Sequence, residues 1–231
     1  MSSLKVICFD LDDTICTLGE GERRARLILI EKLVQESEVS RDEITRAYDN
    51  EWAKIKTNYM SLVKDGLDDI DIREKLMISV LEIIDSEVNP QEYAKLYCSE
   101  TMSGIHIFPD ARGVMDALGE KYQLAMITNG ASAWQREKIE KLDIEGYFEE
   151  IIVSGELGHH KPSPKIFNEM TGRMGVTPNE IIYIGNDYRK DIQGAKATGW
   201  RTAWVKRTDE VRDETVPDYT ISELSELLKI L

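Results

Sequence analysis

The stretch VICFDLDDTIC, from Val6 to Cys16, decides how the rest of the chain is interpreted. Its first half is continuously apolar, as expected of a strand covered on both faces of a parallel sheet. The apolar run then ends in Asp10, Asp12 and Asp13. Like charges crowded at the end of a buried strand either form an ordinary polar turn or require a positive partner. The second possibility makes this stretch a candidate site.

Further β-rich runs follow, and helical patterns separate most of them. The predicted strands are residues 4–9, 123–128, 150–153, 181–185 and 201–205, with a weaker one at 219–221. Helix starts are expected at Pro109-Asp110 and at Ser163-Pro164, where a capping serine precedes a proline at the first helical position. Strands that alternate with helices predict an α/β fold with a doubly wound, Rossmann-like parallel sheet.

Residues 19–98 interrupt this alternation, because they show helical periodicity and no convincing strand. Leu27, Ile30, Leu33 and Val34 recur at helical spacing in the first of these helices. A capping box runs from Ser40 to Glu43, and Asn89-Pro90 starts a helix through Tyr97. A helical block of about 80 residues is far longer than a usual strand–helix connection. The chain is therefore predicted to have a discontinuous core, 1–18 and 99–231, and a separate helical domain, 19–98.

Composition and charge describe a globular protein with a strongly acidic balance. Hydrophobic residues make up 42% of the 231 positions, and the formal net charge is −14. Such a charge disfavours nucleic acid and anionic membrane surfaces as partners. Cys8, Cys16 and Cys98 form neither a disulfide framework nor a metal-binding pair, which indicates a reducing, cytoplasmic setting. We see neither a signal peptide nor a stretch long enough to span a bilayer.

Polar clusters follow four of the predicted strands. They contain Asp10, Asp12, Thr128, Asn129, Lys161, Asn186, Asp187 and Asp191. Any one cluster is explained as well by a helix cap or a turn. In an open parallel sheet, however, ligands bind beyond the carboxyl ends of the strands, near the point where the strand order reverses. Four such clusters in succession therefore predict one shared site.

The chemistry that these groups suit is phosphoryl transfer. Of Asp10 and Asp12, one carboxylate can attack phosphorus, while the other protonates the leaving oxygen and then activates water. Packing these acids together is unfavourable without a cation among them, and Mg²⁺ prefers such oxygen ligands. Thr128, Asn129 and Lys161 would stabilise the phosphate oxygens.

The motifs DLDDT, TNG, HKPSPKIF and GNDYRKD, in this order and at these strand ends, resemble those of the haloacid dehalogenase-like hydrolase superfamily. The resemblance covers the whole chain, including a helical cap inserted after the first motif. It implies that Asp10 is the nucleophile and a metal ligand. It also implies that Asp12 is the general acid and base, with its main-chain carbonyl on the metal. Thr128 and Asn129 match the phosphate-binding motif, and Lys161 matches the lysine of the third motif.

The fourth motif departs from the common pattern of the family. Many members have Gly-Asp where this chain has Gly185-Asn186, followed by Asp187. Asp187 is therefore the preferred direct ligand of Mg²⁺, with Asp191 acting through water or by orienting the site. Whether Asn186 also contacts the metal is left open.

The second acid of the first motif favours a phosphatase over a dehalogenase, because an alkoxide leaving group needs a proton and a halide does not. Caps of this kind usually accompany small substrates, so we expect a small phosphorylated metabolite such as a sugar phosphate, a nucleotide or phosphoglycolate. Arg23, Arg24 and Arg26 open the insert and are interpreted as a solvated patch in preference to a substrate contact.

Several alternatives stay open. A 2-haloacid dehalogenase or a phosphomutase could use the same scaffold, and a phosphoacceptor signalling module shares the paired acids and the lysine. An inactive partner-binding scaffold is disfavoured by the full set of acids. The chain is expected to be a monomer or a homodimer.

Overall fold

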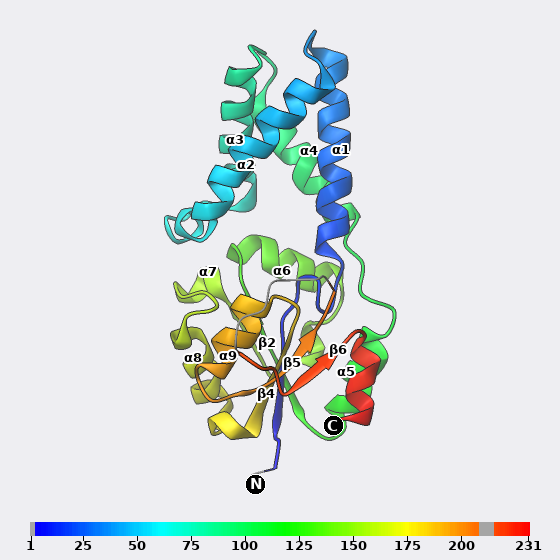
Figure 1. The fold of residues 1–231 in the computed structure, drawn as a ribbon, viewed down its shortest axis with the longest axis vertical. Coiled ribbons are helices and arrows are strands. Elements are labelled where there is room, and N and C mark those ends of the chain that lie inside the picture. Colours follow the sequence, from blue (N-terminus) through cyan, green and yellow to red (C-terminus); the bar gives the residue numbers. More distant parts are fainter. Residues whose placement is uncertain (1–2, 208–214) are drawn as a thin grey trace. The chain divides into compact units, whose positions relative to one another are not determined.

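The computed structural model describes residues 3–207 and 215–231. It divides into two compact units (Figure 1). The core unit comprises Met1–Thr17 and His106–Leu231, and the helical unit comprises Leu18–Ile105. The sequence pattern placed the second boundary at residue 98. The last helix of the insert instead continues to Ser103, which carries the boundary of the helical unit to Ile105.

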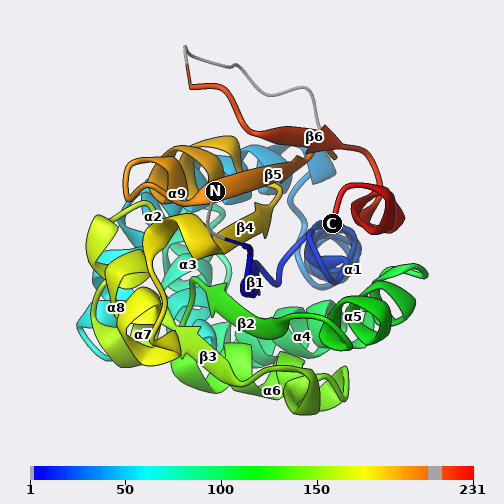
Figure 2. The same ribbon diagram turned by 90° about the horizontal axis from the view of Figure 1, so that it is seen from below.

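The core unit is built on a six-stranded sheet. Its strands are β1 (Val6–Phe9), β2 (Gln123–Thr128), β3 (Glu150–Val153), β4 (Ile181–Gly185), β5 (Arg201–Val205) and β6 (Tyr219–Ile221). Their order is β3-β2-β1-β4-β5-β6, and every neighbouring pair is parallel (Figure 2). The predicted α/β fold is confirmed. β1 begins at Val6, two residues later than expected.

Helices cover both faces of this sheet. They are α5 (Ala111–Gly119), α6 (Ser132–Lys141), α7 (Ser154–Leu157), α8 (Pro164–Met174) and α9 (Gly194–Lys196), with shorter turns at Glu145–Tyr147, Pro178–Glu180, Tyr188–Gln193 and Leu224–Lys229. Figure 2 shows α8 and α9 on one face and α5 on the other. Ser163 caps α8 as predicted, because its side chain accepts a hydrogen bond from Lys165 N. Phe167 and Met170 of α8 then pack on Cys8 and Ala125 in a fully buried cluster.

The order of the strands reverses at β1, which pairs with β2 on one side and β4 on the other. The main-chain N–H of Asp10 continues the pairing by donating to Ile184 O at 2.9 Å. The polar residues after β1, β2 and β4 therefore leave the sheet beside one another, at the position where open α/β sheets bind ligands.

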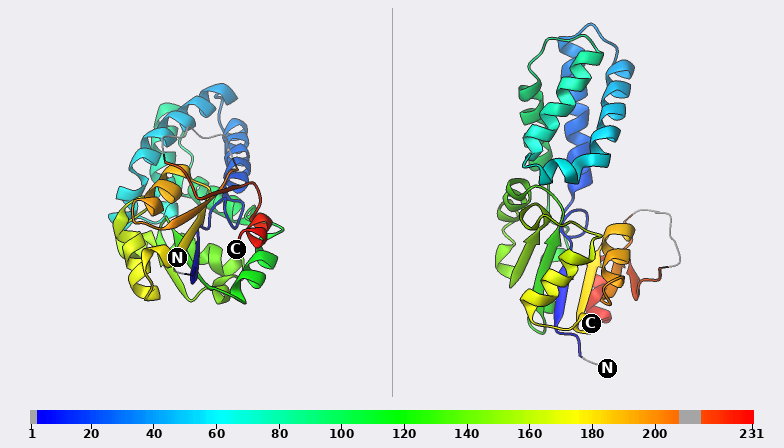
Figure 3. Two further views of the ribbon diagram at one scale, coloured as in Figure 1. Left: turned by 60° about the horizontal axis from the view of Figure 1, so that its bottom comes forward. Right: turned by 90° about the vertical axis from the view of Figure 1, so that its left-hand side faces the viewer.

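The helical unit consists of α1 (Leu18–Glu36), α2 (Arg41–Lys64), α3 (Asp69–Ile83) and α4 (Pro90–Ser103) (Figure 3). The predicted capping box between Ser40 and Glu43 is present. The expected apolar face of α1 was partly wrong, because Leu27 is 56% exposed while Leu29 is buried. A helix buries residues three or four positions apart, and the stripe here runs through Leu29 and Leu33.

A buried arginine lies between the helices of this unit. The guanidinium of Arg73 is 3.8 Å from the ring centre of Trp52 and 4.1 Å from that of Tyr97, and it donates to Glu22. Two of the three arginines near the start of α1 are also paired, Arg24 with Glu100 and Arg26 with Asp49. None of the helices in residues 3–207 and 215–231 is long and apolar enough to cross a membrane.

Candidate active site

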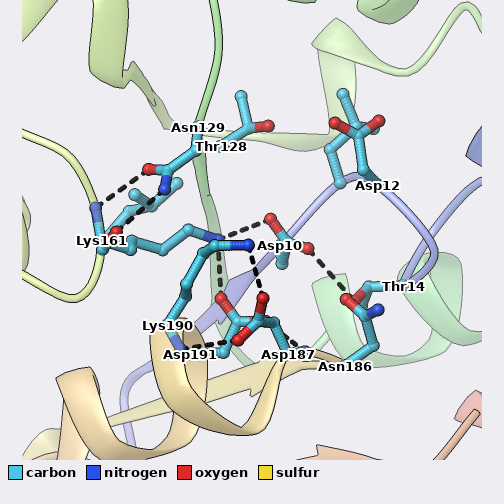
Figure 4. A network of polar contacts seen from close by, with 12 residues as sticks. Asp10, Asp12, Thr14, Thr128, Asn129, Lys161, Asn186, Asp187, Lys190 and Asp191 are labelled. Carbon is cyan, nitrogen blue, oxygen red and sulfur yellow. Dashed lines mark hydrogen bonds and ion pairs between the residues drawn. The ribbon is translucent and has the colours of Figure 1, made fainter. Parts of the chain in front are cut away.

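Asp10 and Lys161 form the centre of the site, at the carboxyl end of β1. Lys161 Nζ lies 2.6 Å from Asp10 Oδ1, and the two residues, lysine and aspartate, are 3% and 6% exposed (Figure 4). Burial raises the pKa of Asp10 above its ordinary value, and the positive charge of Lys161 offsets part of this effect. Lys161 is therefore not the solvated lysine that its position in a loop would suggest.

Two more acceptors complete the environment of Lys161. Its ammonium also donates to Asp191 Oδ1 at 2.7 Å and to the hydroxyl of Tyr183 at 2.7 Å. Burial alone would lower the pKa of Lys161, but Asp10 and Asp191 outweigh it, and the pKa is raised. An ammonium has three donors, so all three are satisfied by these contacts. The lysine is held charged and in one orientation.

Asp191 lies under the site, and its predicted role, acting through water or orienting the site, stays a prediction. Its second oxygen accepts from the main-chain N–H of Asp187 at 2.9 Å, and its side chain is fully buried. The close approach to β4 requires a glycine there: a Cβ on Gly185 would lie 2.4 Å from Asp191 Oδ2. The motif therefore places Asp191 beneath Lys161.

Asn186 faces Asp10, whereas the carboxylate of Asp187 is engaged elsewhere. The hydroxyl of Thr14 lies 3.2 Å from Asn186 Oδ1 and 3.4 Å from Asp10 Oδ2. Asp187 instead accepts from Lys190, from Nζ at 2.6 Å and from the main-chain N–H at 2.8 Å. Partial burial opposes ionisation of Asp187, but Lys190 outweighs it and holds its pKa below the ordinary value. The choice of Asp187 as the direct metal ligand stays a prediction.

Asp12 occupies a different environment from Asp10. Its side chain is 20% exposed, and Lys138 Nζ of α6 lies 2.5 and 2.7 Å from its two oxygens. Gln135, one helical turn earlier, donates to Asp12 Oδ2 at 3.1 Å and also to the hydroxyl of Thr128. The two acids of the DLD motif are therefore held by different cations.

The side chain of Asn129 contacts the main chain of Lys161 in both directions. Asn129 Nδ2 donates to Lys161 O at 3.0 Å, and Asn129 Oδ1 accepts from Lys161 N at 2.9 Å. This pair fixes the start of the loop before the cis peptide bond between Lys161 and Pro162. The amide of Asn129 positions the lysine in this structure, and its predicted contact with phosphate stays a prediction.

The charge question raised by the first motif has a clear answer. Four carboxylates meet three lysines: Asp10 and Asp191 with Lys161, Asp12 with Lys138, and Asp187 with Lys190. Lysines therefore balance most of the negative charge that the sequence assigned to a metal ion. Among residues 3–207 and 215–231, no three His, Cys, Asp or Glu side chains are placed to hold a metal together.

The oxygens beside Thr14 nevertheless suit Mg²⁺. Asp10 Oδ2 and Asn186 Oδ1 both lie next to one hydroxyl, and both are hard oxygen donors. The amide oxygen of Asn186 is a ligand of a different type from the side chains of His, Cys, Asp and Glu. Mg²⁺ needs only one or two protein carboxylates, since it keeps several waters or phosphate oxygens.

The residues at the site that sequence reasoning missed include Gln135, Lys138 and Tyr183. The first two had a signal, because they are three positions apart in the helix that follows TNG, and such residues share one face. Tyr183 also had one: it is the single hydroxyl-bearing residue of a fully buried strand, and a buried hydroxyl needs a partner.

Comparisons with known proteins identify the relatives of this chain. Residues 7–205 match the haloacid dehalogenase-like hydrolase family. A glyceraldehyde 3-phosphate phosphatase of Pyrococcus furiosus is 31% identical over 100% of this chain and 94% of its own. An N-acylneuraminate-9-phosphatase of mouse is 26% identical over 100% of this chain and 95% of its own. The structure of a HAD-hydrolase from Bacillus subtilis, bound to magnesium, has a TM-score of 0.78 and 22% identity over 100% of this chain and 99% of its own.

This protein belongs to the haloacid dehalogenase-like hydrolase family. The resemblance predicted from the four motifs is confirmed, and so is the expectation of a hydrolase of the phosphatase branch, since the sequence relatives are phosphatases.

Proposed function

We propose that this protein is a magnesium-dependent phosphomonoesterase that works through an aspartyl-phosphate on Asp10. The observation that carries the proposal is the contrast between two acids two residues apart. Asp10 is buried against Lys161, and Asp12 is partly exposed against Lys138 and Gln135. Carboxylates in separate environments can take separate roles, one as nucleophile and one as acid and base.

The residues of the chain would act in the following order. Asp10 attacks phosphorus while Lys161 stabilises the charge on the phosphoryl oxygens. Asp12 gives a proton to the leaving oxygen as the ester bond breaks. It then takes a proton from the water that hydrolyses the acyl-phosphate on Asp10. The hydroxyl of Thr128 and the main chain at Asn129 are the proposed phosphate contacts.

Mg²⁺ would be held by Asp10, by the main-chain carbonyl of Asp12 and by Asn186. The amide of Asn186 is favoured over the carboxylate of Asp187, because Lys190 occupies the latter. When bound, the ion would neutralise charge on the phosphate and orient it for attack. The magnesium bound to the Bacillus subtilis HAD-hydrolase supports the choice of this metal.

The helical unit is proposed to act as the cap that selects the substrate. The names of the two relatives point to a shared substrate chemistry. Glyceraldehyde 3-phosphate and N-acylneuraminate 9-phosphate both carry phosphate on the terminal primary alcohol of a hydroxylated carbon chain. We propose a substrate of that class. The side chains of Cys8, Cys16 and Cys98 are all buried thiols, which suits a reducing, cytoplasmic compartment.

The first test compares the wild type and Asp10→Asn on p-nitrophenyl phosphate, with and without Mg²⁺. We expect turnover that needs the metal and is abolished by the substitution. The second compares two isomers, glycerol 3-phosphate and glycerol 2-phosphate, which differ only in whether the ester is primary. Preference for the primary ester supports the proposed class. A wild type that hydrolyses no phosphate ester but releases halide from a 2-haloacid would refute the proposed function.

A further inference from the structure

Two side chains of α6 point at one carboxylate of the site. Gln135 and Lys138 lie three positions apart, and both reach Asp12, which comes from the turn after β1. Lys138 is completely buried, as is Gln135 at 1% exposure. Three hydrogen bonds from these two side chains fix both oxygens of Asp12.

The burial of the Lys138 ammonium has a free-energy cost that its partners must offset. Removing an ammonium from water is costly, and an ion pair offsets this cost only with good geometry. An exposed pair would add little to stability but would avoid that cost. Lys138 Nζ meets both oxygens of Asp12 at nearly equal distances, 2.5 and 2.7 Å. Such a contact restrains the rotation of the carboxylate and also balances its negative charge.

Gln135 extends the same restraint to the phosphate side of the site. Its amide nitrogen lies between Asp12 Oδ2 and the hydroxyl of Thr128 at the end of β2. The main chain at Gly130 passes close to the Gln135 side chain, since a Cβ built on residue 130 would lie 3.0 Å from it. The helix therefore ties Asp12 to the strand that carries Thr128.

We propose that Lys138, assisted by Gln135, is the positioning residue for Asp12. This inference rests on the proposed function. Lys138 holds the carboxyl group of Asp12 where it can give its proton to the leaving oxygen as the P–O ester bond breaks. The Asp12 carboxylate that results then accepts a proton from water while the water oxygen bonds to phosphorus and the bond from Asp10 to phosphorus breaks. Lys138 touches neither substrate nor phosphate, since its side chain is fully enclosed.

The test separates positioning of Asp12 from general support of the fold. Lys138→Met is compared with Lys141→Met, the exposed lysine one turn further along α6. With glycerol 3-phosphate, whose alkoxide needs a proton, we expect kcat of Lys138→Met to fall about 10²- to 10³-fold with KM little changed. The leaving group of 2,4-dinitrophenyl phosphate needs no proton. With this ester, the rate of 2,4-dinitrophenolate release by Lys138→Met in a single turnover is expected to stay within about threefold of the wild-type rate. Lys141→Met is expected to match the wild type on both.

A double variant makes the test independent of folding losses. If Lys138 acts through Asp12, then Asp12→Asn with Lys138→Met is no slower in single turnover of glycerol 3-phosphate than Asp12→Asn alone, within about threefold. Gln135→Met is a second variant, and we expect it to lose less activity than Lys138→Met, again on glycerol 3-phosphate and not on 2,4-dinitrophenyl phosphate. Equal losses on both esters, or a further tenfold loss in the Asp12→Asn background, would overturn the inference. A wild type that hydrolyses neither ester refutes the proposed function itself.

Discussion

The hydroxyl of Tyr183 offers a sharp test of how Lys161 is held. It accepts from Lys161 Nζ at 2.7 Å and donates to Ile127 O at 2.9 Å, and the residue is completely buried. Tyr183→Phe keeps the ring, which packs edge-on against the ring of Phe167 with 5.5 Å between the ring centres. It leaves one donor of a buried ammonium without an acceptor and removes the donor to Ile127 O. Each orphaned group costs about 1–3 kcal/mol.

We therefore expect Tyr183→Phe to lower the free energy of unfolding by about 3 kcal/mol. For a chain of this length, 1 kcal/mol lowers the melting temperature by about 2–4 °C, so the expected fall is about 6–12 °C. The assay is urea and thermal unfolding followed by circular dichroism. Tyr122→Phe is the matched control, because the hydroxyl of Tyr122 donates only to Leu231 O and is partly exposed. A fall in melting temperature for Tyr183→Phe that is no larger than the fall for Tyr122→Phe would refute the conclusion that Tyr183 holds the buried Lys161 ammonium.

Two further predictions concern stability away from Lys161. Gly21→Ala in α1 is expected to destabilise the protein by about 1–3 kcal/mol in urea unfolding, because the added Cβ would lie 2.7 Å from a main-chain oxygen of α4. Gly113→Ala in α5 is the control, because nothing lies within 4 Å of its added Cβ, and it should instead stabilise the protein by about 0.5–1 kcal/mol. Burial opposes ionisation of Asp218, but hydrogen bonds from Lys196 and Thr202 hold its pKa below the ordinary value, so its contribution is present above about pH 4 and is lost as the pH falls through the lowered pKa. The difference in unfolding free energy between wild type and Asp218→Asn should therefore shrink from pH 6 to pH 3; a constant difference would contradict the assignment.

The strands and the position of the site could be predicted from the sequence for a physical reason. Strands buried on both faces are continuous apolar runs, and polar turns bound them, so the runs at 123–128, 150–153, 181–185 and 201–205 coincide with β2 to β5. The parallel order then brings the ends of β1, β2 and β4 together. In α1, by contrast, apolar residues occur on more than one face of the helix. Only the packing shows that Leu29 is buried and Leu27 is exposed.

The burial of Lys138 against Asp12 could not be predicted in the same way. Lys138 lies in the segment SAWQREKIEK, which is rich in charge and looks like an exposed helix. Its burial depends on Asp12, 126 positions earlier in the chain. The sequence therefore indicated a cluster of unbalanced carboxylates, and the structure supplies the lysines that balance them.

Those lysines change what is expected of the metal site, and Asn186 is the residue that tests it. The Thr14 hydroxyl lies beside both Asn186 and Asp10, whereas Lys190 occupies the carboxylate of Asp187. Asn186→Asp adds a negative charge next to Asp10, so without Mg²⁺ like charges should lower the melting temperature. With Mg²⁺ the same charge should tighten binding about tenfold, or about 1.4 kcal/mol, by isothermal titration and by the metal-dependent rise in melting temperature. Asp187→Asn should change the affinity by less than about threefold. The reverse pattern, with Mg²⁺ binding lost in Asp187→Asn and unchanged in Asn186→Asp, would instead make Asp187 the direct ligand, because Lys190 would then have to release it when the metal binds.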